Sequence, residues 1–416
     1  MKWKVNDTSR TTVDLSFVFL GYLIILAYFY PVATLLPNII QIPVFVLWLF
    51  SIRRKNRLWG NILKISMINI IIFIVSFIRC IAAEHLNLNY FSTMQVVIQR
   101  YNFLIFPVLF VYINSLDRYH KKKIYQLSFF CIFITLIFSL YYVFFVDPQA
   151  IRNTQRDFLW GVGDFTLMYA IAILSGPLLF LIIEKVKKKE KILYLLIFYL
   201  TILLTILLCN LVTSVVIAVV STFVMYCVSK KRKVLLVILF PIAFVFLILR
   251  KVFAKLLYMV AEKGVFYWST SNKLIAIANI INGVGNSSNT DTFAKRIVLA
   301  AQSVGSFKEY PLFGIDWKYH VSGKIGCHMQ WADDLGRYGI VGNLLLIPNY
   351  FFIARYTIKS SRVGMARNSI ITCWIVFVIL GFLNPNLSTA ILMLMFVVIP
   401  TFDSAIEVKD EKDTGR

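Results

Sequence analysis

The sequence predicts an all-α, polytopic integral membrane protein, and three observations support that prediction. Of the 416 residues, 59% are hydrophobic and only 15% are charged, whereas about a quarter of the residues in a soluble domain are charged. The hydrophobic residues form runs long enough to cross a hydrocarbon core, which takes roughly 20 residues of helix. The basic residues gather in short gaps between those runs. These features exclude the disordered, fibrous and ordinary water-soluble classes.

About twelve apolar runs follow one another along the chain. They occupy residues 15–31, 35–52, 61–83, 94–115, 124–146, 165–183, 192–209, 211–229, 234–249, 338–356, 369–383 and 387–402. The predicted organisation is therefore transmembrane helices 1 to 9 in residues 1–249, one large loop in residues 250–337, transmembrane helices 10 to 12 in residues 338–402 and a tail in residues 403–416.

The distribution of basic residues predicts which side of the membrane each loop faces. With residue 1 placed inside, 28 of the 43 Lys and Arg fall on the inner side and 15 on the outer side, while the 20 acidic residues divide equally. A bias confined to Lys and Arg is the form that the positive-inside rule takes. We therefore expect both termini in the cytoplasm and residues 250–337 outside. The net charge of +23 then reflects contact with an anionic lipid leaflet rather than with nucleic acid.

The loop of residues 250–337 is the largest non-membrane element, and its pattern predicts several short elements. Residues 252–259 have the pattern of an amphipathic helix lying on the membrane surface. Residues 282–292 form a polar connector, residues 293–304 have helical periodicity, and residues 310–314 (YPLFG) form a turn. A further helix is expected to begin near Trp331 and to lead into the next span.

Several motifs of soluble chemistry are missing from the sequence. There is no G-x-x-x-x-G-K-[ST] loop for ATP, no H-E-x-x-H or paired Cys/His pattern for zinc, and no D-x-D in a loop to hold a nucleotide diphosphate through Mg²⁺. We therefore expect neither a cofactor nor a metal.

Arginines near the outer membrane surface are the first candidate functional residues. Arg100 lies about two turns inside the fourth run, where a charge is costly and normally faces a polar cavity or a partner; the alternative is an arginine that snorkels to the headgroups. Arg152 and Arg156 precede the sixth run, and Arg296 lies on the helical segment of the large loop. Each is alternatively a solvated surface charge. Guanidinium groups bind phosphate through paired N–H groups, so converging arginines would suit a diphosphate.

His328 is the candidate general base. It precedes the sequence MQWADDLGRYGIVG, which leads into the next span, so its imidazole is expected at the membrane interface. An imidazole can accept a proton near neutral pH. Asp333 and Asp334 follow within about two turns and could orient His328 or act as the base in its place.

At these residues the chain resembles the O-antigen polymerase and O-antigen ligase superfamily of bacterial membrane glycosyltransferases. The similarity lies in Arg296 within KRIVLAAQSVGSFKEYPLFGIDW and in His328 within CHMQWADDLGRYGIVG, with a weaker match at Arg156 in RDFLWGVGDFTLMYA. Where family members have an arginine after T-x-S, this chain has Val215, so Arg152 or Arg100 would take that role.

The resemblance implies a GT-C-like membrane glycosyltransferase in the bacterial cytoplasmic membrane. Its substrates would be oligosaccharides on polyprenyl diphosphate, and its partners would be the lipid bilayer, a chain-length regulator and a flippase. The implied activity is that of a polymerase of O-antigen or capsule repeat units. Arg100, Arg152, Arg156 and Arg296 would bind the diphosphate, and His328, Asp333 and Asp334 would supply the base.

Two other functions remain open at this point. A ligase that transfers finished polysaccharide to lipid A core or another acceptor would use the same chemistry. A flippase or transporter would be favoured by inverted repeats and broken helices in matching halves, but apart from Arg100 charges deep in the runs are scarce. A non-enzymatic scaffold is the remaining possibility.

Overall fold

The computed structural model describes residues 15–29, 45–48, 105–151, 161–209, 211–229, 250–263, 292–315, 324–361 and 364–405, together with positions 67, 70, 71, 74, 78, 159, 271, 274, 275 and 278. Every regular element in these residues is helical. The helices are α1 (Leu15–Tyr28), α6 (Arg118–Phe145), α8 (Phe165–Lys187), α9 (Leu193–Leu208), α10 (Val212–Ser229), α12 (Arg250–Glu262), α14 (Thr292–Glu309), α15 (Gln330–Ser360), α16 (Gly364–Leu383), α17 (Thr389–Met393) and α18 (Phe402–Ala405). A shorter apolar helix covers Ile105–Ser115. The all-α prediction is confirmed for this part of the chain.

Four of the described helices are long and apolar enough to cross a membrane: α6, α8, α10 and α16. The exposed face of α9 shows what surrounds them, because Leu193, Ile197, Leu200, Leu204 and Leu207 recur at helical spacing and are all exposed. A row of exposed leucine and isoleucine is incompatible with water but suits lipid tails. The protein is therefore membrane-embedded.

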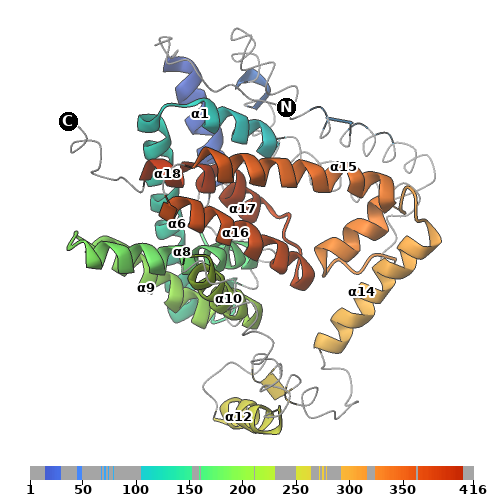
Figure 1. Cartoon of the computed structure of the whole chain (residues 1–416). Helices are drawn as coiled ribbons and strands as arrows, with labels where there is room; N and C mark the ends of the chain where they lie inside the picture. The colour runs from blue at the N-terminus through green and yellow to red at the C-terminus, as the bar shows by residue number, and fades with distance from the viewer. Residues whose placement is uncertain are drawn as a thin grey trace.

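Helix α8 lies at the centre of the bundle and packs against α9, α10, α16 and α17 (Figure 1). Its closest neighbour is α10, and the contact depends on Pro177. Because proline has no N–H, the carbonyl of Ile173 loses its helical donor; the Ser221 hydroxyl of α10 donates to that carbonyl over 2.6 Å. A Cβ on Gly176 would lie 2.3 Å from the Ser221 carbonyl oxygen. Because Gly176 has no side chain, α10 can come close enough for Ser221 to bond the carbonyl that Pro177 leaves without a donor. Neighbouring helices in membrane bundles often satisfy such carbonyls in this way.

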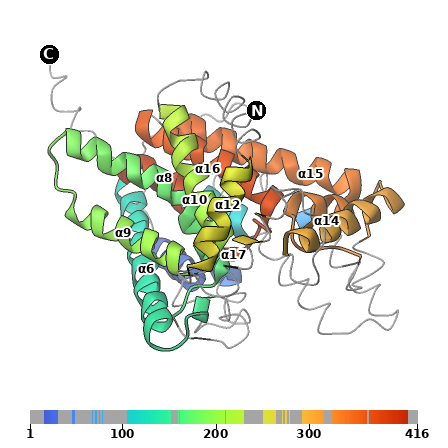
Figure 2. The ribbon, with the colours of Figure 1, turned by 90° about the horizontal axis from the view of Figure 1, so that it is seen from below.

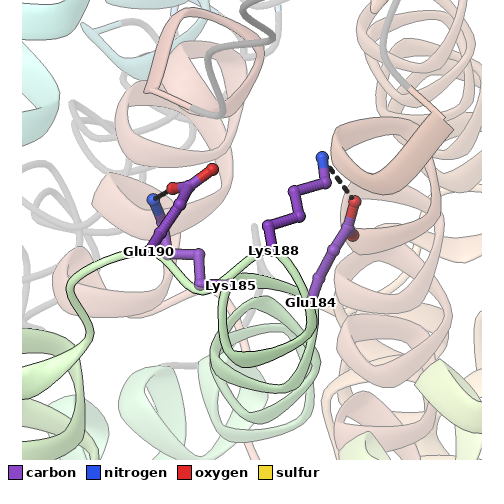
Figure 3. A network of polar contacts seen from close by, with 4 residues as sticks. All are labelled: Glu184, Lys185, Lys188 and Glu190. Carbon is purple, nitrogen blue, oxygen red and sulfur yellow. Dashed lines mark hydrogen bonds and ion pairs between the residues drawn. The ribbon is translucent and has the colours of Figure 1, made fainter.

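The end of α8 and the turn that leads to α9 contain a cluster of lysines, two of which pair with glutamates. Lys185 pairs with Glu190 at 2.5 Å, and Lys188 pairs with Glu184 at 3.3 Å (Figure 3). Exposed pairs of this kind contribute roughly 0–1 kcal/mol each. They leave Lys187, Lys189 and Lys191 as excess positive charge at this end of the bundle.

The last apolar segment, Thr389–Ser404, is not a single regular helix. It consists of α17, a π-helical stretch at Leu394–Val398, a 3₁₀ turn at Ile399–Thr401 and α18. Every residue from Ala390 to Phe402 is buried, so this segment runs through the core. Phe396 lies at its centre and has ring contacts with Phe110, Tyr350 and Trp374.

Helices α14 and α15 form a second unit that extends from one side of the bundle (Figures 1 and 2). The two helices pack against each other, and both views place α14 beside the N-terminal part of α15, on the side away from α9. Helix α15 also packs on α16, where Trp331 and Tyr350 both contact Phe377. This unit contains the predicted helix of residues 293–304, the turn of residues 310–314 and the start of the predicted tenth span.

Several of the predicted spans can be compared with described helices, four of which are long and apolar enough to cross a membrane. The runs predicted at 165–183, 192–209 and 211–229 correspond to α8, α9 and α10, whereas the span predicted to begin at 338 belongs to α15, which already begins at Gln330. The amphipathic segment predicted at 252–259 lies within α12. The run predicted at 234–249, most of the runs at 35–52 and 61–83, and residues 94–104 of the run at 94–115 lie outside the described residues.

Candidate functional site

The backbone before α15 is folded against α14, and Ser303 holds the two together. The Ser303 hydroxyl donates to Asp333 Oδ1 at 2.6 Å and accepts from the Gly326 N–H at 2.9 Å. One turn later, the Ser306 hydroxyl donates to the Lys324 carbonyl at 2.5 Å. A Cβ on Gly326 would lie 2.2 Å from the Leu299 carbonyl oxygen, so only glycine lets the loop approach α14 this closely. The segment that contains His328 therefore has a fixed position relative to α14.

Asp333 gathers the hydrogen bonds that shape this loop. In addition to Ser303, its carboxylate accepts from the Cys327 N–H and the Met329 N–H, both at 3.2 Å. The side chain is only 2% exposed, and this burial raises the pKa of Asp333 above its ordinary value, against the opposing effects of the Ser303 hydroxyl, the Arg337 charge and the two N–H donors. Such an arrangement, with one acceptor and several donors, suits a residue that positions the loop.

His328 lies between the two backbone N–H groups that Asp333 binds. It directly precedes the N-cap residue Met329, and its side chain is exposed. Because Cys327 and Met329 are both tied to the Asp333 carboxylate, the backbone of His328 is fixed from both sides. The structure thus brings together His328 and Asp333, with Asp333 as a positioning residue and the imidazole at the surface.

Arg337 is a cation of this site that the sequence patterns did not single out. Its guanidinium Nη2 lies 3.1 Å from Cys327 Sγ, and its positive charge acts on Asp333. The signal available in the sequence was the spacing of four residues between Asp333 and Arg337, which places both on one face of a helix. The guanidinium therefore belongs to the immediate surroundings of His328.

Arg296 lies on α14, one helical turn before Leu299, whose carbonyl contacts Gly326. The structure describes its backbone position but not its side chain. Arg296 thus belongs to the helix against which the His328 loop packs. Arg100, Arg152 and Arg156 lie outside the described residues, so their predicted role stays a prediction.

A break in α15 follows this site. Gly339 adopts φ +59° and ψ −164°, a conformation accessible essentially only to glycine. The turn of residues 310–315 inserts at the break: the N–H groups of Ile340 and Val341 donate to the carbonyls of Pro311 and Leu312 at 2.8 and 3.0 Å, and the Ile315 N–H donates to the Gly336 carbonyl at 2.9 Å. The backbone groups released by the break are therefore satisfied by the turn, as buried backbone groups normally are.

Asn343 stabilises the same break from within α15. Its side-chain amide donates to the Gly339 carbonyl at 2.7 Å and to the Asp334 carbonyl at 2.9 Å. The two halves of α15 are thus joined by hydrogen bonds that do not depend on the regular helical pattern.

Asp334 faces a different neighbour from Asp333. Its Oδ1 accepts from Gln330 Nε2 at 2.8 Å, and Gln330 Oε1 accepts from the Leu387 N–H at 3.4 Å in the loop between α16 and α17. Trp331 reinforces this contact, because its Nε1–H donates to the Val378 carbonyl at 2.8 Å and its ring rests on Gly381. The N-terminal half of α15 is therefore anchored to α14 on one side and to the end of α16 on the other.

The described residues contain no group of three His, Cys, Asp or Glu side chains that could hold a metal ion. What the described site offers is an exposed imidazole, a nearby guanidinium and a carboxylate that fixes the loop. No protein-family model matches the chain, and no curated protein matches it in sequence.

Proposed function

We propose that the protein is a polysaccharide polymerase of the O-antigen or capsule type, which joins lipid-linked repeat units without nucleotide or metal. The observation on which the proposal mainly rests is the joint folding of two sequence segments: α14, with Arg296, and the loop that begins α15, with His328, are tied together by Ser303 and Asp333. These are the segments in which the sequence resembles the polymerase and ligase superfamily.

In the proposed reaction, an acceptor hydroxyl forms a bond to the anomeric carbon of the donor glycan. The bond from that carbon to the diphosphate oxygen breaks, and the polyprenyl diphosphate leaves with the electron pair. The His328 imidazole takes the hydroxyl proton, a contribution of typically 10²- to 10⁴-fold to the rate. Asp333 fixes the His328 backbone, and Asp334 is the alternative base.

Arginines would stabilise the charge that develops on the departing diphosphate. Arg296 is the first candidate because its helix packs against the His328 loop, and Arg100, Arg152 and Arg156 complete the proposed set. A preorganised cationic donor lowers the barrier because it needs no reorganisation when charge appears. Losing one such donor typically costs about 10²- to 10³-fold in rate.

The proposed architecture is a GT-C-like bundle of about twelve spans in the cytoplasmic membrane, with both termini inside and the α14–α15 unit outside. Support comes from the excess of Lys and Arg on the predicted inner side and from the lysine-rich turn between α8 and α9. A donor that is already activated as a diphosphate explains how a reaction on the outer face would proceed without ATP.

Single substitutions in cells test the proposal. His328→Ala and Arg296→Ala should each abolish long-chain polysaccharide on gels, with protein levels unchanged. His85→Ala and Arg355→Ala are matched controls, because His85 lies in another predicted outer loop and Arg355 is exposed near the C-terminal end of α15; both should leave the chain-length pattern intact. Normal long chains in the His328 and Arg296 variants would remove these residues from the site.

A further inference from the structure

The part of α15 that follows the break at Gly339 has an exposed apolar face. Four large apolar side chains on this face recur at intervals of three or four residues and are all exposed, and we call them the α15 stripe: Ile340, Leu344, Ile347 and Phe351. Residues at these intervals lie on one side of a helix. The other side of α15 packs on α16, where Tyr350 contacts Phe377.

Lipid is the surrounding that suits the α15 stripe. A continuous exposed apolar surface marks contact with a membrane or with a partner. The neighbouring helix α16 is long and apolar enough to cross a membrane, and it exposes Ile375, Val378 and Phe382 at the same kind of spacing. Because two helices that pack on each other both turn apolar side chains outwards, the same hydrocarbon surrounds both.

The turn that follows α14 extends the α15 stripe beyond the helix. The Pro311 carbonyl accepts the N–H of Ile340, the first residue of the stripe, at 2.8 Å. The Leu312 carbonyl accepts the next N–H of α15, that of Val341, at 3.0 Å. The side chains of Leu312 and Phe313 are 58% and 54% exposed. Two large apolar side chains therefore lie next to the start of the stripe, outside any helix.

An ion pair shows where this apolar surface ends. Glu309, the last residue of α14, pairs with Lys324 at 3.1 Å, and both side chains are exposed. Charged side chains are costly in hydrocarbon, so this pair belongs in water or among headgroups. Leu312 follows Glu309 by three residues, which is at most about 11 Å of chain. The boundary between water and hydrocarbon therefore falls within the turn itself.

We infer that Leu312 and Phe313 insert into the lipid leaflet next to the α15 stripe, and that the turn anchors the α14–α15 unit at the membrane surface. The anchor also sets the height of the His328 loop above the membrane. That loop is tied to the end of α14, because the Ser306 hydroxyl donates to the Lys324 carbonyl. The inference concerns the position of the turn and holds whatever reaction the protein performs.

Spin labelling of the full-length protein in liposomes locates the turn. Leu312→Cys and Phe313→Cys are made in a Cys327→Ser background and labelled with a nitroxide, and the background alone serves as the blank. Ile347→Cys is the matched control for lipid, and Lys308→Cys, exposed in the last turn of α14, is the matched control for water. Collisions of each nitroxide are measured with oxygen, which concentrates in hydrocarbon, and with a water-soluble nickel chelate.

We expect the ratio of oxygen to nickel collisions at positions 312 and 313 to match the ratio at 347 and to exceed the ratio at 308. Ratios equal to that at 308 would place the turn in water and overturn the inference. Labels at 312 and 313 that neither reagent reaches would show that protein covers the turn, such as a second copy of the chain, and would overturn it as well.

Photolabelling of the wild type needs no substitution, so it decides the question if the variants do not fold. An apolar diazirine dissolved in the liposomes gives a carbene on illumination, and glutathione removes any carbene in the water. Trypsin releases the turn in the peptide 309–318 and the α15 stripe in the peptide 338–355. Both peptides should carry the label. An unlabelled 309–318 peptide would contradict insertion of the turn.

Discussion

Asp333 illustrates how one buried carboxylate can fix the backbone on both sides of a neighbouring residue, here His328. The sequence offered Asp333 and Asp334 as equivalent neighbours of His328, because both fall within two turns of it. In the structure the two carboxylates have different partners, Ser303 and the loop N–H groups for Asp333 and Gln330 for Asp334. That division depends on contacts with α14 and with the α16–α17 loop, which are distant in sequence, and no local spacing encodes it.

The pKa of Asp333 predicts a pH dependence of stability. Burial raises the pKa of this carboxyl above its ordinary value of 3.8, so the folded state binds a proton more readily than the unfolded state. The contribution of Asp333 to the free energy of unfolding is therefore greatest below pH 3.8, and it decreases as the pH rises through the folded-state pKa. Asp333→Asn cannot titrate and should lack this dependence.

Thermal unfolding of both proteins across this pH range measures the effect. The melting temperature of the wild type, relative to that of Asp333→Asn, should decrease from acid towards neutral pH. A relative increase over the same range would mean that the hydrogen bonds from Ser303, Cys327 and Met329 outweigh burial, and that the pKa is lowered instead.

At the scale of elements, the break in α15 is the feature that most directly shapes the site. Two observations show that glycine is required at position 339. Its φ of +59° is unfavourable for other residues, and a Cβ there would lie only 2.5 Å from the Leu312 carbonyl. Gly339→Ala should destabilise the protein by about 3 kcal/mol through backbone strain and overpacking. The measurement is the melting temperature of the purified protein.

Gly305→Ala provides the matched control for Gly339→Ala. Gly305 lies within α14, where a Cβ would meet nothing within 4 Å. Alanine favours a helix by about 0.5–1 kcal/mol over glycine, so this variant should melt at the wild-type temperature or slightly above it. Equal effects of the two substitutions would contradict the role assigned to the break.

The sequence predicted the individual helices better than their connections. The helical segment at 293–304 and the turn at 310–314 were expected from periodicity and from the YPLFG pattern, and both occur within α14 and the turn that follows it. The break at Gly339 was not expected, because its partner is that turn, more than twenty residues earlier. The contact between Gln330 and the α16–α17 loop was not expected for a related reason, because its partner Leu387 lies 57 residues later.

At the scale of the whole molecule, the described residues form a lipid-facing bundle with the α14–α15 unit at one side (Figure 1). The proposal needs this unit to lie outside the membrane, and Cys327 provides a direct test. Cys327 is exposed, whereas the other described cysteines are buried or half-buried. A membrane-impermeant maleimide should label the protein in spheroplasts, and Cys327→Ser should remove the label.

Labelling in inverted membrane vesicles gives the opposite case. There the outer surface is enclosed, and Cys327 should stay unlabelled until detergent is added. Labelling of Cys327 in inverted vesicles but not in spheroplasts would place the α14–α15 unit in the cytoplasm and end the argument for an outer-face reaction.

Reconstitution tests the central claim most directly. Purified protein in liposomes, supplied with lipid-linked repeat units and EDTA but no nucleotide, should produce a ladder of glycans together with free polyprenyl diphosphate. His328→Ala should reduce the ladder about 100-fold or more, as expected for loss of a general base. Absence of a ladder with the wild type, or a ladder that His328→Ala leaves unchanged, would contradict the account.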